Sequence, residues 1–225
     1  MSSQSTVIIT PPPALSQRDL RSFTAAYEKK LLIAMAKRLP AWIGPDHLTV
    51  LGAVAMAGAG LCYRLVAVSP LAFLGVNLFL FLNWFGDSLD GTLARVREKQ
   101  RPRYGFYVDH LVDAFGAIFL LGGLASSGLV TPLAALSLLI AYLLLQIHIA
   151  LKAHTTRVFQ IAFGGIGGTE ARILLGVLNL GLFAWPALIP ALTPMVWLAV
   201  ASLIALVVAD GVATGRALDR EERTY

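Results

Sequence analysis

The sequence has a single cysteine, Cys62, and it lies within a long apolar run. One cysteine excludes a disulfide framework within the chain and any metal site built from several thiolates. The sequence also contains neither a G-x-x-x-x-G-K-[ST] loop nor a G-x-G-x-x-G fingerprint, and no internal repeat is evident. The two common glycine-rich loops that hold nucleotide phosphates are therefore absent.

Charge is scarce as well, because charged residues make up only 14% of the 225 residues and hydrophobic residues make up 57%. This composition excludes an ordinary soluble domain and is typical of a polytopic membrane protein. Six apolar runs are each close to the roughly 20 residues that a helix needs to cross a bilayer. They cover residues 45–68, 70–93, 104–124, 130–151, 170–189 and 194–212. We therefore expect an all-α fold with a six-helix transmembrane catalytic domain over residues 40–215 and a cytoplasmic tail at 216–225.

The N-terminal region has neither the basic start nor the apolar core of a cleaved signal peptide. Residues 1–15 contain a run of prolines that opposes helix formation, so we predict a disordered tail there. Ser16 and Asp19 then resemble the start of a helix, and the sequence predicts an amphipathic helix over residues 16–39. We expect this basic helix to be interfacial and to lie on the membrane surface, and the alternative is a solvated helix that packs on its own protein.

Basic residues are distributed unevenly between the two ends of the predicted spans. The N-terminal region, the 95–103 and 152–172 connections and the C-terminal tail carry nearly all 18 Lys and Arg residues, and only Arg64 lies near the other ends. By the positive-inside rule, both termini should face the cytoplasm. The net charge of +5 is thus placed at membrane edges, where it favours anionic lipid headgroups over nucleic acid as partners.

Four carboxylates interrupt two of the apolar runs: Asp87, Asp90, Asp109 and Asp113. Their spacings of three and four residues place each pair on one face of a helix, and a short connection would turn the two pairs toward each other. Carboxylates packed together repel unless a cation holds them, and hard divalent ions prefer such oxygen ligands. The pattern predicts Mg²⁺ or Mn²⁺, as one or two ions, although intramembrane carboxylates also serve proton relays and ion pathways.

Small residues lie at helical spacing from these carboxylates. Gly91 and Ala94 follow the first pair by four positions each, and Gly105 precedes Asp109 by four. A missing side chain lets a bulky anionic ligand approach the helix backbone. The small residues and the positive charge of Arg95 together indicate that the ligand carries phosphate. In the alternative interpretation, the small residues only allow neighbouring helices to pack closely, and the Arg95 side chain extends to water.

The residues from 87 to 113 resemble the signature of the CDP-alcohol phosphotransferases, which is D-x-x-D-G-x-x-A-R, a spacer of eight or nine residues, then G-x-x-x-D-x-x-x-D. All eight fixed positions are present, namely Asp87, Asp90, Gly91, Ala94, Arg95, Gly105, Asp109 and Asp113. The resemblance extends over about residues 40–215 and includes P-D-H-L-T at 45–49, where the family has P-N-x-L-T. Asp46 stands in place of the usual asparagine.

The resemblance implies an integral membrane enzyme of phospholipid synthesis that transfers a phosphoryl-linked group from a CDP-linked donor to an alcohol and releases CMP. It implies that the four aspartates hold two divalent ions and that Asp113 also takes the proton of the acceptor. Thr49, Gly91, Ala94, Arg95 and Gly105 would lie near the nucleotide and its phosphates. Members of the family commonly form homodimers, and the small chain is similar to bacterial members, which implies the inner membrane with the site facing the cytoplasm.

Two versions of the reaction stay open in the sequence. Asp109-His110 and Thr169-Glu170 resemble the branch that uses CDP-choline or CDP-ethanolamine with a diacylglycerol or ceramide-like acceptor, where the histidine is a candidate base. The small chain favours CDP-diacylglycerol with a small polar alcohol. His110 lies about 100° round the helix from the Asp109 and Asp113 face, so Asp113 is the first choice of base.

Three residues near the glycine-rich stretch at 163–168 are candidates for binding the acceptor, namely Arg157, Glu170 and Arg172. A divalent-cation or proton-coupled transporter is the alternative from another class. Transport would require polar residues across the whole membrane, but residues 71–82 and 117–124 are almost wholly apolar. A site that opens to one side of the membrane fits this pattern better than a channel.

Overall fold

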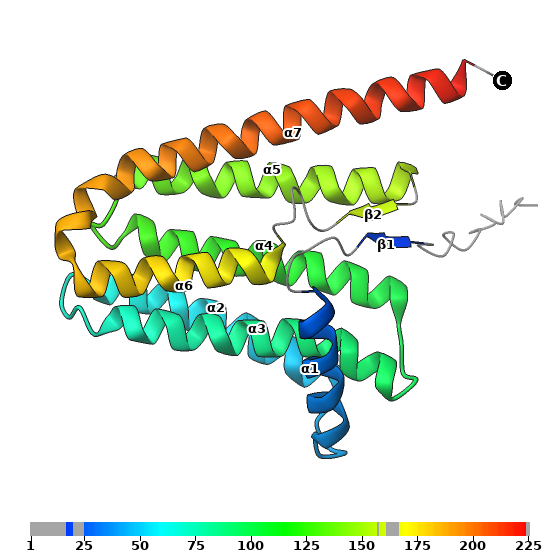
Figure 1. Cartoon of the computed structure of the whole chain (residues 1–225), viewed down its shortest axis with the longest axis horizontal. Coiled ribbons are helices and arrows are strands. Elements are labelled where there is room, and N and C mark those ends of the chain that lie inside the picture. Colours follow the sequence, from blue (N-terminus) through cyan, green and yellow to red (C-terminus); the bar gives the residue numbers. More distant parts are fainter. Residues whose placement is uncertain (1–16, 20–24, 157, 161–166, 224–225) are drawn as a thin grey trace, which may run out of the picture.

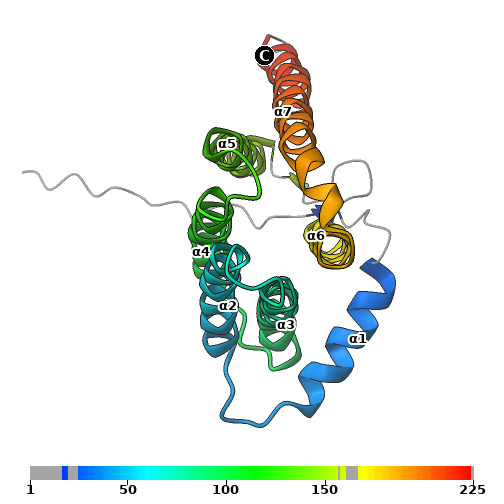
Figure 2. The same ribbon diagram turned by 90° about the vertical axis from the view of Figure 1, so that its left-hand side faces the viewer.

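The computed structural model describes residues 17–19, 25–156, 158–160 and 167–223. Long helices run side by side in a bundle, and a shorter helix lies obliquely beside them (Figures 1 and 2). The helices are α1 (Ala25–Arg38), α2 (Pro45–Leu65), α3 (Ala72–Val96), α4 (Pro102–Ala125), α5 (Pro132–Thr156), α6 (Gly168–Ala184), the 3-10 helix η1 (Pro186–Ala191) and α7 (Leu192–Glu222). Two short strands, β1 (Gln17–Asp19) and β2 (Val158–Gln160), complete the described elements.

Among the residues that the structure describes, five helical segments are long and apolar enough to cross a membrane: α2, α3, α4, α5 and the continuous segment from η1 through α7. The expected integral membrane protein with a helical fold is therefore supported. Helix α6 has only 17 residues, so the six-span count stays a prediction. Helix α7 continues through most of the predicted tail and ends at Glu222.

Helix α6 ends early because a proline follows it. The sequence predicts a span to residue 189, but the helix stops at Ala184 and Trp185 adopts φ −133° and ψ 80°. A residue before proline is pushed out of the helical region, and Pro186 directly follows Trp185. The chain then turns through η1 into α7, so α6 begins part-way along the bundle and ends level with the other helix ends (Figure 1).

The predicted helix over residues 16–39 is wrong at its start. Residues 17–19 form β1, which pairs in parallel with β2, and the helix begins only at Ala25. Hydrogen bonds to a segment about 140 positions away replace the local bonds that the capping pattern predicted. The predicted disordered tail at 1–15 lies outside the described residues.

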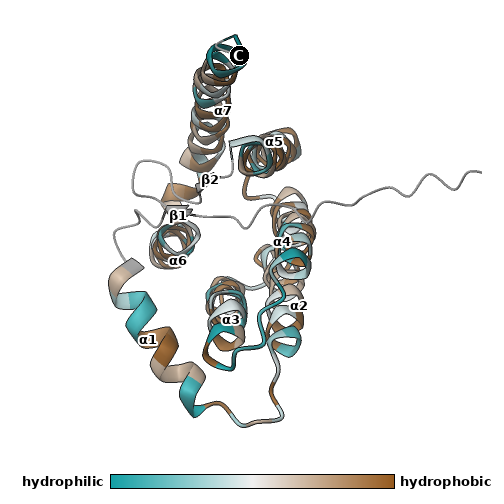
Figure 3. Cartoon of the chain, turned by 90° about the vertical axis from the view of Figure 1, so that its right-hand side faces the viewer, coloured by the Kyte–Doolittle hydropathy of each residue, from teal (hydrophilic) through white to brown (hydrophobic). Residues whose placement is uncertain are grey.

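Helix α1 packs on its own protein through one face. Its buried residues Leu32 and Ala36 join Leu48 of α2 and Leu89 and Leu93 of α3 in one apolar cluster. The opposite face exposes apolar side chains among basic ones, and α1 alternates between hydrophilic and hydrophobic in Figure 3. Packing on the protein, one of the two alternatives for this helix, is confirmed, and contact of its outer face with lipid stays a prediction.

Glycines bring α2 into backbone contact with its two neighbours. A Cβ atom on Gly123 of α4 would lie 2.0 Å from the carbonyl oxygen of Gly60 of α2. A Cβ atom on Gly86 of α3 would lie 2.5 Å from the carbonyl oxygen of Leu48. Small residues allow such close approach between helices in a membrane protein, and here they hold the two acid-bearing helices against α2.

A buried polar chain fastens α6 to this three-helix core. The Tyr63 hydroxyl donates to the Asn179 side-chain oxygen at 2.9 Å, and the Asn179 amide donates to Asn77 at 2.9 Å. The Asn77 amide donates in turn to the Gly176 carbonyl oxygen at 3.1 Å. Asn179 is fully buried, so each of these groups depends on its partner for hydrogen bonding.

Arg97 at the end of α3 holds the connection between α1 and α2. Its guanidinium donates to the carbonyl oxygens of Leu39 at 3.1 Å and Pro40 at 2.9 Å, and also to that of Ile43. One cation thus satisfies several carbonyl groups that follow the end of α1.

Replacing Arg97 with alanine is expected to free this connection without unfolding the bundle. Hydrogen bonds to a charged group contribute about 1.5–3 kcal/mol, so trypsin cleavage after Arg38 should become at least about tenfold faster. The measurement is limited proteolysis in detergent-lipid micelles, with Arg216→Ala, an exposed arginine of α7, as the matched control. Equal cleavage rates for both variants would show that Arg97 does not restrain the connection.

Candidate functional site

The four aspartates lie on two antiparallel helices that the short 97–101 connection joins. Helix α3 carries Asp87 and Asp90, and α4 carries Asp109 and Asp113. All four line one cavity, together with Thr49, Gly52, Asn83 and Val112. The structure thus brings together the two carboxylate pairs that their spacing predicted to meet. The free volume of about 10 Å³ is room for about one water-sized particle.

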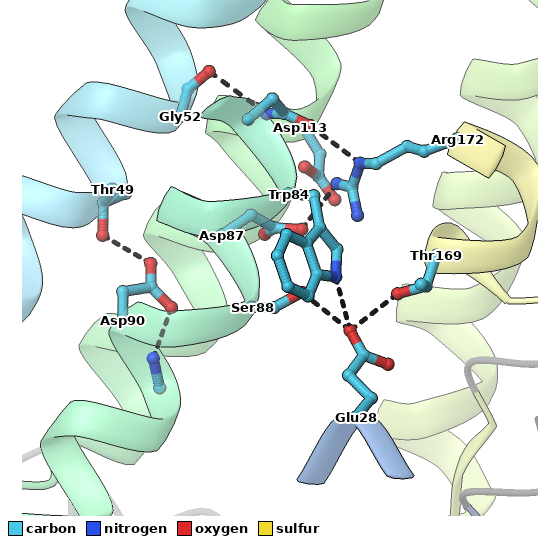
Figure 4. A network of polar contacts seen from close by, with 12 residues as sticks. Glu28, Thr49, Gly52, Trp84, Asp87, Ser88, Asp90, Asp113, Thr169 and Arg172 are labelled. Atoms are coloured by element: carbon cyan, nitrogen blue, oxygen red, sulfur yellow. Dashed lines mark hydrogen bonds and ion pairs between the residues drawn. The ribbon is translucent and has the colours of Figure 1, made fainter. Parts of the chain in front are cut away.

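Asp90 is held at the end of the cavity nearer α2. One of its carboxylate oxygens accepts a hydrogen bond from the Thr49 hydroxyl at 2.6 Å, and the other accepts one from the Gly91 backbone (Figure 4). Thr49, expected near the nucleotide, therefore touches a carboxylate and lines the cavity itself. Asp46, the departure from the family pattern, pairs with Arg101 at the exposed surface.

Asp87 pairs with a guanidinium from α6. Arg172 Nη2 lies 2.5 Å from Asp87 Oδ2, and Arg172 Nε donates to the Asn83 side-chain oxygen at 2.8 Å. The Asn83 amide donates to the Gly52 carbonyl oxygen at 3.1 Å, which links α2, α3 and α6 around the cavity (Figure 4). Arg172, expected to bind the acceptor, is thus a direct neighbour of a predicted metal ligand and neutralises part of its charge.

Asp113 lies against α5. Gln146 Nε2 is 3.5 Å from Asp113 Oδ2, and the same nitrogen donates to the Tyr142 hydroxyl at 2.9 Å. The Asp113 contact is at the limit of a hydrogen bond, so this carboxylate is only loosely held compared with Asp87 and Asp90. A loosely held carboxylate that lines the cavity can accept a proton from a bound ligand.

His110 does not line the cavity. Its Nδ1 lies 2.9 Å from the Phe106 carbonyl oxygen, and its ring packs on the Phe106 ring with centroids 4.2 Å apart. A carbonyl oxygen can only accept, so Nδ1 carries the proton and the ring is oriented along its own helix. Of these two residues, Asp113 lines the cavity and His110 does not.

The small residues of the motif lie beside the cavity and do not line it. A Cβ atom on Gly105 would meet nothing within 4 Å, and one on Gly91 would come near only the Arg95 side chain, at 3.5 Å. Ala94 is half-buried on α3, and Arg95 is exposed and donates to the Thr92 hydroxyl at 3.0 Å. This edge of the site therefore has open space beside the Arg95 guanidinium in the last turn of α3.

The other two acceptor candidates have different outcomes. Glu170 accepts a hydrogen bond from the Gly167 backbone at 2.9 Å and so caps the start of α6. Arg157 lies outside the described residues. A further charged cluster, which the sequence did not predict as a unit, joins α5 to α7: Asp210 lies 2.7 Å from both His148 and Lys152.

Sequence reasoning missed Asn83, Gly52, Gln146 and Glu28 as neighbours of the acidic residues. A signal existed for Asn83, which precedes Asp87 by four positions in an apolar run and so shares its helix face. Gln146 and Glu28 come from distant helices, and no spacing rule joins them to the motif.

No model of a known protein family matches the chain, and no curated protein matches it. The resemblance to the CDP-alcohol phosphotransferases therefore rests on the eight motif positions, and membership of that family is a proposal.

Proposed function

We propose that this chain is a metal-dependent CDP-alcohol phosphotransferase of phospholipid synthesis. The observation that carries the proposal is the cavity lined by Asp87, Asp90, Asp109 and Asp113 from two antiparallel helices. A half-buried group of four carboxylates with Arg172 beside it retains negative charge, and a cation is the ordinary means of balancing it.

The residues around the cavity fit Mg²⁺ or Mn²⁺ by their chemistry. They offer carboxylate oxygens with the Thr49 hydroxyl and the Asn83 amide oxygen nearby, and hard divalent ions prefer such donors. Within the described residues, no three His, Cys, Asp or Glu side chains already form a metal-holding group. Asp87 is paired with Arg172 and Asp90 with Thr49, so binding would require Asp87 to turn from Arg172 and Asp90 to turn from Thr49. Two divalent ions would supply charge neutralisation of the donor's pyrophosphate when bound.

The transfer step can be assigned to residues of the chain. The oxygen of the acceptor hydroxyl forms a bond to the phosphorus that carries the donor's alcohol, and the bond from that phosphorus to CMP breaks. CMP leaves with the electron pair, and Asp113 takes the proton of the hydroxyl. Arg95 and the open space at Gly91 and Gly105 would accept the phosphates beside the cavity, which would bring the reacting groups close to Asp113.

We propose CDP-diacylglycerol as the donor and a small polar alcohol as the acceptor. The alternative, CDP-choline or CDP-ethanolamine with a diacylglycerol, depends on His110 and on the Thr169-Glu170 pair. His110 bonds to its own helix, and Glu170 caps α6. Neither residue lines the cavity, whereas Asp113 does, and this favours the first version of the reaction.

The orientation follows from charge. The connection between α3 and α4, which is hydrophilic in Figure 3, and the end of α7 lie at the same end of the bundle in Figure 1. The connections 66–71, 126–131 and 185–191 carry no charge. We propose a six-span homodimer in a bacterial inner membrane, with both termini and the acidic cavity facing the cytoplasm.

The test is CMP release by the purified chain in detergent-lipid micelles with Mg²⁺. CDP-diacylglycerol is offered with a panel of polar alcohols, and CDP-choline and CDP-ethanolamine are offered separately with diacylglycerol. We expect CMP from the first donor, complete loss with EDTA, and recovery with Mn²⁺. Asp87→Asn and Asp109→Asn should each lower the rate by about 100-fold or more, because each removes a charged ligand.

The matched control is Asp219→Asn, which makes the same change in an exposed residue of α7 that pairs with Arg223. Its rate should equal that of the wild type. Absence of CMP from every donor, together with uptake of Mn²⁺ into sealed vesicles, would replace the proposal with cation transport.

A further inference from the structure

Glu28 of α1 joins three side chains from two other helices. Its Oε1 accepts hydrogen bonds from Trp84 Nε1 at 2.7 Å, from the Ser88 hydroxyl at 3.2 Å and from the Thr169 hydroxyl at 2.8 Å (Figure 4). Trp84 and Ser88 belong to α3, and Thr169 belongs to the first turn of α6. A single carboxylate oxygen thus fixes the spacing of α3 and α6 from outside the cavity.

The residues that Glu28 binds flank the ion pair at the cavity. Trp84 lies three positions before Asp87 and Ser88 directly follows it, while Thr169 lies three positions before Arg172. Residues three apart on a helix are neighbours on its surface, so any shift of Thr169 moves Arg172 as well. The Glu28 contacts and the Asp87–Arg172 ion pair therefore connect α3 and α6 at two neighbouring points.

The Glu28 contacts are separate from those that dock α1. Leu32 and Ala36 bury the inner face of α1 one and two turns further along, and Arg97 holds the connection after it. Loss of the carboxylate alone should therefore leave α1 in place.

We propose that Glu28 is a positioning residue that determines where Arg172 lies relative to Asp87. Through this position, Glu28 sets the affinity of the acidic cavity for a divalent ion. The link to metal binding rests on the proposed function, whereas the link to α6 does not. Loss of a residue that orients a metal ligand commonly changes metal affinity or enzyme activity by about 10- to 100-fold. Arg172 is such a neighbour of Asp87, and Glu28 acts on it through Thr169.

The experiment compares the full-length wild type with Glu28→Ala, Thr169→Val and Thr169→Ser in micelles. Mn²⁺ alone is the probe, and its dissociation constant is read from the electron paramagnetic resonance signal of the free ion. Amide hydrogen exchange of residues 168–172 reports the start of α6 independently of metal. The melting temperature shows whether each variant is folded, and Glu222→Gln, an exposed glutamate at the end of α7, is the control.

We expect Glu28→Ala and Thr169→Val each to change the Mn²⁺ dissociation constant by about 10-fold or more and to speed exchange at residues 168–172. Thr169→Ser retains the hydroxyl and should keep the wild-type values. The double variant Glu28→Ala with Thr169→Val should change little beyond either single variant, because both remove the same tie.

The two proposals fail in different ways. If the wild type binds Mn²⁺ and folded Glu28→Ala matches it in both affinity and exchange, the positioning role is wrong and the proposed function stands. If the wild type binds no Mn²⁺ and releases no CMP while Glu28→Ala still speeds exchange in α6, the proposed function is wrong. In that case the proposed effect of Glu28 on metal binding is wrong as well, and only its effect on the position of α6 remains.

Discussion

Replacing Asp113 with asparagine is expected to lower CMP release by about 1,000-fold at saturating Mn²⁺. A positioned general base contributes about 100- to 10,000-fold to such a step, and asparagine cannot accept the proton. Asp113 lines the cavity, and its hydrogen bond from Gln146 is long, so its oxygens are available to a ligand. The measurement is the initial rate of CMP release, with the Mn²⁺ dissociation constant determined alongside to separate lost binding from lost catalysis.

His110→Ala is the informative comparison. Its ring bonds to Phe106 of the same helix, so we expect a loss of less than about tenfold, from altered packing only. A loss for His110→Ala as large as that for Asp113→Asn would assign the base to His110. It would also restore the choline and ethanolamine version of the reaction.

Gly123→Ala is expected to be the most damaging single-methyl change in the bundle. The new Cβ atom would lie 2.0 Å from the Gly60 carbonyl oxygen, so α2 and α4 must separate. Forcing extra volume into a packed contact costs about 1–3 kcal/mol or more. For a chain of this size, that should lower the melting temperature by about 2–12 °C. Cys62, the single cysteine, allows a thiol-reactive dye to report the unfolding.

The adjacent glycine supplies the control. A Cβ atom on Gly122 would meet nothing within 4 Å, so Gly122→Ala makes the same change in the same turn without a clash. Alanine also favours a helix over glycine, so its melting temperature should be equal to or slightly above that of the wild type. Similar losses for Gly122→Ala and Gly123→Ala would show that the backbone contact between α2 and α4 does not set stability.

Local spacing was enough to predict the acidic cavity. Asp87 and Asp90 share a helix face, as do Asp109 and Asp113, and the short connection between their helices leaves an antiparallel arrangement as the simple outcome. Most spans were also predictable, because each depends on a continuous apolar run. The early end of α6 could have been predicted from Pro186, because the residue before a proline is disfavoured in a helix. The predicted span was based on hydropathy alone and therefore extended beyond Pro186.

The rest of the site depends on contacts that no local rule contains. Arg172 reaches Asp87 across 85 positions and Glu28 reaches Thr169 across 141. The pairing of β1 with β2 likewise joins distant segments, and it places residues 17–19 in a strand where a helix was predicted. Such partners are fixed by how the helices pack, and packing is a property of the whole bundle.

The long separation between Glu28 and Thr169 has a consequence for biosynthesis. The four aspartates leave the ribosome within a short stretch of chain, whereas Arg172 follows Asp87 by 85 residues and Thr169 follows Glu28 by 141. At about 5–20 residues per second, α1 waits about 7 to 28 seconds for its partner on α6. Until then the nascent acidic helices lack their arginine, so a ribosome stalled before residue 168 should display an incomplete site whose carboxylates are open to the surrounding ions.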